Sequence, residues 1–97
     1  MHLLPLRGKD TVDKLLNKHD VYWYEVEDAF IAADPSGWVK NLADTDERDV
    51  NISETLVGRT LLMVAEADPV QDVTFLVSCY PPNKEDIARY EKEARSR

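Results

Sequence analysis

The chain has little of several features that would restrict its function. Its 97 residues include one cysteine, Cys79, so an internal disulfide is excluded, and no cysteine and histidine cluster has the spacing of a zinc site. No apolar run approaches the roughly 20 residues that a membrane span needs, and the first residues lack the apolar stretch of a signal peptide. We therefore expect a cytoplasmic protein with no membrane contact, metal or cofactor.

Positive charge is also scarce. Twelve Lys and Arg residues stand against 19 Asp and Glu residues, which gives a formal net charge of −7. Nucleic-acid affinity comes largely from Lys and Arg side chains that neutralise phosphates, so any RNA contact has to be local. The chain also lacks a glycine-rich phosphate loop and a nucleophile-base pair, which argues against a small-molecule enzyme.

The remaining composition is typical of a soluble globular chain. Hydrophobic residues make up 43% of the sequence and charged residues 32%. A chain of this length can bury one modest core but not two independent ones. We expect residues 1–97 to form a single domain.

The first helical pattern follows Asp10, which we expect to be the N-cap. Val12, Leu15, Leu16 and His19 recur at the spacing of one helix face, and the helix should end near His19. Asp20 then falls where a chain leaving a helix often needs a left-handed residue.

Two more helices are expected. One runs from about Trp23 to Ala33 and is stopped by the Asp-Pro-Ser-Gly segment 34–37. Its apolar side is predicted to carry Trp23, Val26, Phe30 and Ile31. The last begins at Asn83, with Asp86 three residues on as a variant capping box. Its inner side is predicted to carry Ile87, Tyr90 and Ala94.

Between these helices the hydrophobic period changes to two. The expected strands are Trp38 to Leu42, a strand around Val50 and Ile52, Arg59 to Glu66, and a strand in which Val73, Phe75, Val77 and Cys79 alternate. Short links between them predict hairpins. The expected fold class is a two-layer α+β domain with two N-terminal helices, a four-stranded antiparallel meander and a C-terminal helix.

Several short motifs occur in an order that resembles the BrnT family. They are Lys18-His19-x-Val21, Ala29-Phe30, Asp34-Pro35, Glu47-Arg48 with Ile52 four residues after the arginine, Gly58-Arg59-Thr60-Leu61, Ser78 and Tyr90-Glu91. The match covers nearly the whole chain from the first helix onward. BrnT proteins are the toxins of bacterial type II toxin-antitoxin pairs, and their fold is related to RelE-type ribonucleases.

This resemblance implies metal-independent cleavage of RNA, inhibition by a DNA-binding antitoxin of ribbon-helix-helix or similar type, and autoregulation of the operon. The chain departs from the family where a Ser-Ala-Arg-Arg segment is usual, since it has Ser78-Cys79-Tyr80-Pro81. Asp20 and Ser53 also stand where the family usually has glycine. A catalytically inactive BrnT-like module that binds a protein is therefore the alternative prediction, and an aromatic helix face adds a homodimer as an expected partner.

A ribonuclease of this kind needs a base for the 2′-hydroxyl, an acid for the leaving oxygen, and cations for the charge on the phosphate. The predicted catalytic residues are Lys18, Arg48, Arg59 and Tyr80.

Each of these residues also has a structural interpretation. Lys18 suits a helix C-terminus, and Arg48 suits a surface ion pair. Arg59 could be an edge-strand charge, and Tyr80 could pack against the last helix. His19 shares the apolar face of its helix, which favours a packed histidine over a catalytic one.

Overall fold

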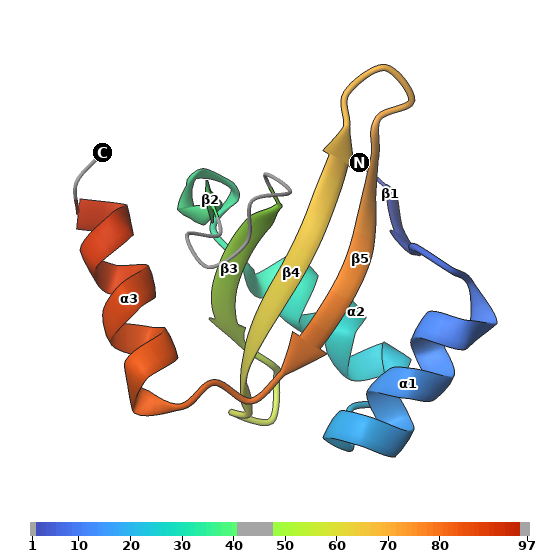
Figure 1. The fold of residues 1–97 in the computed structure, drawn as a ribbon, viewed down its shortest axis with the longest axis horizontal. Helices are drawn as coiled ribbons and strands as arrows, with labels where there is room; N and C mark the ends of the chain where they lie inside the picture. The colour runs from blue at the N-terminus through green and yellow to red at the C-terminus, as the bar shows by residue number, and fades with distance from the viewer. Residues whose placement is uncertain (1, 41–47, 96–97) are drawn as a thin grey trace.

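The computed structural model describes residues 2–40 and 48–95. Its helices and strands, coloured along the chain in Figure 1, are β1 (His2–Pro5), α1 (Lys9–His19), α2 (Trp23–Ala32), β2 (Val39–Lys40), β3 (Asp49–Glu54), β4 (Thr60–Asp68), β5 (Val73–Tyr80) and α3 (Lys84–Arg95). A 3₁₀ turn, Pro35–Gly37, follows α2. Within the described residues no helix is long and apolar enough to cross a membrane.

The described strands form one five-stranded sheet in the order β1-β5-β4-β3-β2. The antiparallel neighbours β2-β3, β3-β4 and β4-β5 confirm the predicted meander in outline. The expected four-stranded antiparallel sheet is nevertheless wrong, because β1 adds a parallel strand beside β5. The predicted strand at Trp38 to Leu42 is observed only as Val39–Lys40, and its last two residues lie outside the described part.

The extra strand β1 has no clear pattern of its own in the sequence. It has four residues and ends in a proline, which lacks the backbone N–H that strand pairing uses. Its hydrogen bonds come from a segment far along the chain, for example where the His2 N–H donates to the carbonyl of Asp72 at 3.2 Å. Backbone pairing with the edge of β5 therefore makes this segment a strand.

Helices cover both faces of the sheet, so the predicted two-layer arrangement is also wrong. Neighbouring residues of a strand point to opposite faces. Leu61 and Met63 of β4 pack toward α1 and α2, whereas Leu62 and Val64 belong to a second cluster that Tyr90 of α3 joins. Figure 1 accordingly shows α2 behind the sheet and α3 beside β3, away from α1.

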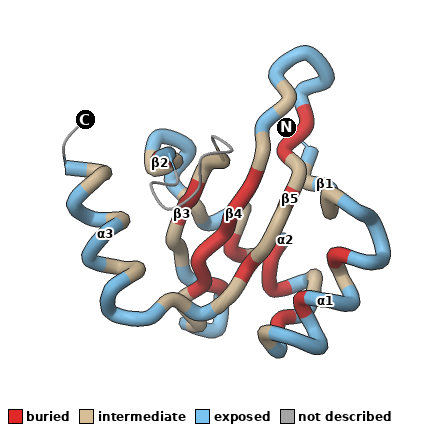
Figure 2. Tube along the Cα trace, viewed as in Figure 1, coloured by how far each residue is buried: buried red, intermediate tan, exposed pale blue. Residues whose placement is uncertain are grey.

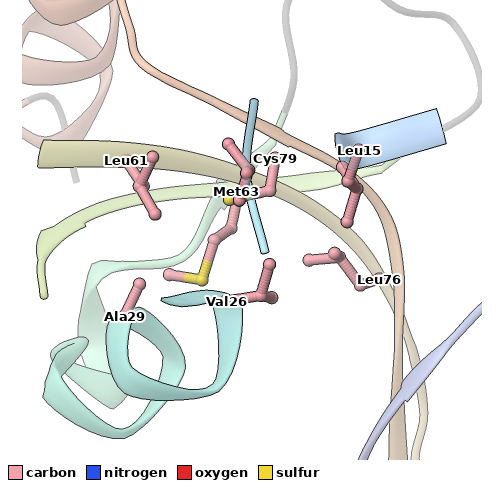
Figure 3. Packing of buried hydrophobic residues seen from close by; sticks show 8 residues of the cluster. Leu15, Val26, Ala29, Leu61, Met63, Leu76 and Cys79 are labelled. Atoms are coloured by element: carbon pink, nitrogen blue, oxygen red, sulfur yellow. The ribbon is translucent and has the colours of Figure 1, made fainter. Parts of the chain in front are cut away.

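The larger core lies between the sheet and the two N-terminal helices. Met63 is fully buried, and its side chain extends toward Ala29 and Val26 of α2 (Figure 3). In Figure 2 burial is concentrated along β4, β5 and the inner side of α2, while α3 is half-buried or exposed throughout. Burial of a large apolar side chain contributes about 1.5–3 kcal/mol. The larger cluster has more buried residues than the one on the other face, so its hydrophobic contribution is the greater.

A change of register interrupts β5. Val64 is paired with Ser78 while the next residue, Ala65, is paired with Leu76, so Val77 is left without a partner, as in a β-bulge. The bulge moves Cys79 onto the same face as Leu76, in the larger core. The expected phase of Val77 with Cys79 was therefore wrong, although the predicted burial of Cys79 is confirmed.

The helix ends agree with most of their sequence signals. Helix α1 ends at His19, and Asp20 adopts the left-handed conformation with φ 55° and ψ 43°. Asp10 is not the N-cap, because the helix begins earlier, at Lys9, after Gly8 with φ 56°. Before α3, Asn83 and Asp86 exchange two backbone-to-side-chain hydrogen bonds of 3.1 and 2.8 Å, which confirms the capping box.

Ile31 is the one member of the predicted apolar side of α2 that lies in solvent. Its side chain is 81% exposed, whereas Val26 and Ala29 are fully buried. Five residues of helix rotate the side chain by roughly 140° from Val26, which turns Ile31 away from the sheet. An isoleucine this exposed contributes little to the core.

Replacing Asp20 with glycine is expected to raise the free energy of unfolding by about 0.5–1 kcal/mol, because the left-handed conformation strains a residue with a Cβ but not glycine. The backbone contacts of this position, an N–H to the Leu16 carbonyl at 3.1 Å and a carbonyl that accepts from Arg59 at 2.9 Å, use atoms that glycine retains. Urea unfolding measures the difference. Asp20→Ala is the control and should be destabilised; a glycine variant less stable than the parent would contradict the explanation.

Candidate functional site

A cavity of about 320 Å³ lies between α1, the turn before it and the bulge of β5. Its described lining residues are Leu6, Arg7, Asp10, Thr11, Lys14, Leu15, Lys18, His19, Arg48, Val77 and Ser78. Four of them are Lys or Arg and one is Asp. In a chain of net charge −7, this is a strong local excess of positive charge. We refer to it as the basic cavity.

Helix α1 supplies two of these cations from one face. Lys14 and Lys18 are four residues apart, so their side chains project side by side. The orientation of α1 is set by Leu15, which is 2% exposed and packs in the larger core. The turn before the helix is held where the Arg7 N–H donates to Oγ1 of Thr11 at 3.0 Å.

Arg48 reaches the cavity from the other side, just before β3. Its Nε donates to Oε1 of Glu66 at 3.1 Å. The two side chains are 27% and 41% exposed, so the predicted surface ion pair of Arg48 is confirmed with a partner on β4. This contact orients the guanidinium.

A second hollow of about 510 Å³ adjoins α1 and shares Arg7, Asp10, Lys14 and Lys18 with the basic cavity. Its other described lining residues are Asp13 and Asn17. The shared cations therefore face a surface larger than a single phosphate group. Two carboxylates reduce the positive potential on this outer side.

His19 and Tyr80 meet at the edge of the basic cavity. Their ring centroids are 5.3 Å apart, with an interplanar angle of 35°. Burial, and then the charge of Lys18, lower the pKa of His19 below its ordinary value. Burial, and then the charge of Asp86, raise the pKa of Tyr80. At neutral pH the imidazole is neutral and the phenol keeps its proton, so one can accept a proton and the other can donate one.

Tyr80 also packs with the smaller core cluster that Tyr90 and Ala94 of α3 join. Its predicted packing in the core is therefore confirmed, and direct packing against the last helix stays a prediction. Its predicted role in catalysis stays a prediction, with the contact to His19 as its link to the basic cavity.

Arg59 is held elsewhere. Its Nη1 donates to Oε1 and Oε2 of Glu25, both at 2.9 Å, and to the carbonyl of Asp20 at 2.9 Å. The Glu25 side chain is 10% exposed and that of Arg59 30%. The same carboxylate accepts a 3.1 Å hydrogen bond from the Tyr22 N–H, at the start of α2. Arg59, which directly precedes β4, thus joins the start of that strand to the corner between α1 and α2.

The pKa of Glu25 reflects this pairing. Burial alone raises it, but hydrogen bonds from Arg59 and the Tyr22 backbone, together with the Arg59 charge, outweigh burial and leave the pKa below its ordinary value. Glu25 is therefore a carboxylate in the folded protein. The stability that it contributes is present above the pKa of the unfolded chain and is lost as the pH falls through the folded value.

Other candidate groups stay apart from the basic cavity. Burial raises the pKa of Cys79 to about 12, so its thiol is a poor nucleophile at neutral pH. Tyr22 and Tyr24 are 49% and 62% exposed and stack on each other with centroids 5.7 Å apart. In the part of the chain that the structure describes, no three His, Cys, Asp or Glu side chains form a group that could hold a metal ion.

The sequence thus indicated half of the cavity's cations. Lys18 and Arg48 were predicted and come together, but Arg7 and Lys14 were missed. The spacing of Lys14 and Lys18 along one helix face is a signal that could have found Lys14. Arg7 had none, since its place depends on β1.

Fold and site together define an α+β protein with a local basic cavity beside its sheet. Compared with protein-family models, with curated proteins and with solved structures, the chain gives no match in any of the three.

Proposed function

We propose that the protein is a BrnT-like toxin, the ribonuclease component of a type II toxin-antitoxin system, and that it binds the RNA backbone in the basic cavity. The observation that carries this proposal is the gathering of Arg7, Lys14, Lys18 and Arg48 around one cavity in an otherwise acidic chain. Lys and Arg side chains neutralise phosphates and stabilise charge that grows on a phosphoryl group.

The residues at the cavity support cleavage without a metal ion. The neutral imidazole of His19 takes the proton of a ribose 2′-hydroxyl, whose oxygen attacks the adjacent phosphorus. Lys18 and Arg48 stabilise the negative charge on the phosphate oxygens. The bond to the 5′-oxygen breaks, that oxygen receives a proton from the Tyr80 phenol or from water, and a 2′,3′-cyclic phosphate remains. Arg59 acts on the fold, through Glu25.

A catalytically inactive module that binds a protein is the second candidate. It is favoured by the pairing of Arg59 with Glu25 and Asp20, and by the tyrosine and proline at the two positions where BrnT proteins carry arginine. Both candidates have a protein partner, which for the toxin is a DNA-binding antitoxin.

Induced expression in a bacterial host without a cognate antitoxin tests the proposal, with growth and total RNA integrity as readouts. The parent chain is expected to arrest growth and to cleave RNA. Purified protein should cut RNA in the presence of EDTA. The double variant Lys18→Ala/Arg48→Ala is expected to lose cleavage by at least about 100-fold, since removing one group that stabilises the transition state costs about that much.

The matched control is Lys84→Ala/Lys92→Ala on α3, which also removes two positive charges, but at positions away from the cavity. It should cleave like the parent. Normal growth and intact RNA with a folded parent chain would exclude the ribonuclease and leave the inactive module as the candidate. Cleavage that survives in Lys18→Ala/Arg48→Ala would place the activity elsewhere on the molecule.

A further inference from the structure

The exposed Ile31 lies between two hollows on the outer side of α2. One, of about 480 Å³, is lined among the described residues by Phe30, Ile31, Ala33, Pro35, Trp38, Asp49, Ala65, Ala67 and Thr74. The other, of about 420 Å³, is lined by His2, Leu3, Leu4, Glu27, Phe30, Ile31 and Val73. Phe30 and Ile31 belong to both, so the two hollows flank one ridge. We refer to this surface as the Ile31 face.

The Ile31 face is apolar and aromatic. The Phe30 and Trp38 rings pack with centroids 6.2 Å apart and an interplanar angle of 53°. Leu4 is 46% exposed and Ile31 is 81% exposed. Apolar side chains that are exposed together, rather than singly, are typical of an interaction site.

The charged residues among those that line the Ile31 face are acidic. None of the described residues that line the two hollows is Lys or Arg, and their carboxylates are Glu27 and Asp49. Asp34 stands between two lining residues, and its Oδ1 accepts 2.9 and 2.8 Å hydrogen bonds from Ser36. Asp49 forms a 3.4 Å ion pair with Lys40, so Glu27 and Asp34 carry most of the acidic character. This rim complements a cationic partner and repels an anionic one.

We propose that the Ile31 face binds a basic amphipathic helix of a protein partner. Two apolar side chains of that helix, one or two turns apart, enter the hollows on either side of Ile31. Its Lys and Arg side chains meet the acidic rim. Amphipathic helices commonly lay their apolar face into a hydrophobic groove, and helix side chains pack as ridges into the grooves of the partner surface.

A helix suits the surface better than an added strand. The edge strand β1 has four residues and ends in Pro5, and the described part of the opposite edge, β2, has two. Strand addition relies on main-chain hydrogen bonds, and edges this short provide few of them. The two hollows are suited to single side chains of a partner. The regular spacing of side chains along one helix face can place one side chain in each hollow.

The proposal goes beyond the proposed ribonuclease function and does not depend on it. The described residues that line the Ile31 face include none of those that line the basic cavity. An inactive chain would keep the same face. RNA binding and helix binding are therefore expected to respond to different substitutions.

A library of helical peptides of about 18 residues, roughly five turns, selected against the full chain tests the proposal. Enriched peptides are expected to carry a net positive charge and two apolar residues spaced three, four or seven positions apart. Isothermal titration of an enriched peptide against Ile31→Lys should give at least tenfold weaker binding. Glu27→Gln should weaken binding less and reduce its salt dependence.

Leu56→Lys is the matched control, because Leu56 is 88% exposed in the turn between β3 and β4 and the substitution adds the same charge. It should bind the peptide like the parent, and circular dichroism should show both variants folded. Enrichment of acidic peptides, failure to enrich any helix, or equal binding to Ile31→Lys would overturn the proposal. The proposal would also be overturned if the free chain forms a dimer that the Ile31→Lys substitution dissociates, since the Ile31 face would then bind a second copy of the chain.

Discussion

Arg59→Ala is expected to lower the free energy of unfolding by about 3 kcal/mol, because it leaves the Glu25 carboxylate buried without its cation. The two oxygens of Glu25 each accept a 2.9 Å bond from Nη1 of Arg59, and the residue is 8% exposed. The same substitution removes the hydrogen bond to the Asp20 carbonyl, which closes the α1 to α2 corner. Urea or thermal unfolding of the purified protein measures the loss.

The control for this prediction is Arg48→Ala. Its ion pair with Glu66 is more exposed on the carboxylate side, so the expected loss is at most about 1 kcal/mol. Removing both partners, in Arg59→Met/Glu25→Leu, should recover much of the stability lost in Arg59→Ala, because no buried charge remains. A loss for Arg59→Ala no larger than for Arg48→Ala would show that the Glu25 pair contributes little.

The pH dependence of stability gives an independent readout. With Arg59 present, the pKa of Glu25 is below its ordinary value, so acidification through that value destabilises the parent. Without Arg59, burial dominates and raises the pKa of Glu25. Protonation of Glu25 then removes an unpaired buried charge, so it should reduce the loss of stability in the variant. The difference in stability between parent and Arg59→Ala is therefore expected to shrink as the pH falls below about 4.3, the ordinary pKa of a glutamate.

His19→Gln is expected to reduce RNA cleavage by about 100-fold or more, since general-base catalysis typically contributes 10²–10⁴. RNA binding should change much less, because Arg7, Lys14, Lys18 and Arg48 keep their charges. The pKa of His19 is below 6.5, so the parent should lose activity only as the pH falls below that value. Single-turnover cleavage of an RNA oligonucleotide between pH 4.5 and 8 measures both effects.

His2→Gln is the matched control, since His2 is the other histidine of the chain and lies on β1, outside the basic cavity. It should leave both the rate and the pH profile unchanged. If His19→Gln cleaves at the parental rate, His19 is a packed residue and another group takes the proton. If both histidine variants lose activity equally, the effect is on the fold.

The local elements of this fold were predictable because their causes lie within a few residues. The end of α1 at His19, the left-handed Asp20 and the capping box of Asn83 and Asp86 depend on backbone sterics and on short hydrogen bonds. The predicted strands β3, β4 and β5 followed from a period of two and from the apolar run of β4. Each of these patterns can be recognised in the sequence without knowing which distant segment packs against it.

The arrangement of these elements was not predictable, since it depends on contacts between distant segments. Strand β1 exists because β5 offers it an edge, and the bulge at Val77 decides which face Cys79 occupies. The face of the sheet that α3 covers, and the exposure of Ile31, follow from how whole elements pack.

The candidate site divides in the same way. The sequence by itself indicated the cationic residues Lys18 and Arg48, because residue type and position next to a helix end or a strand are local properties. For His19 it favoured a packed side chain over a catalytic one. Only the tertiary structure decided that Arg7 and Lys14 join them around one cavity, and that Arg59 forms an ion pair with Glu25 instead. The physical reason is that charged side chains act together only when they lie close in space. Those distances are set here by the packing of α1 on β5 and by the contact of Arg59, before β4, with the corner between α1 and α2.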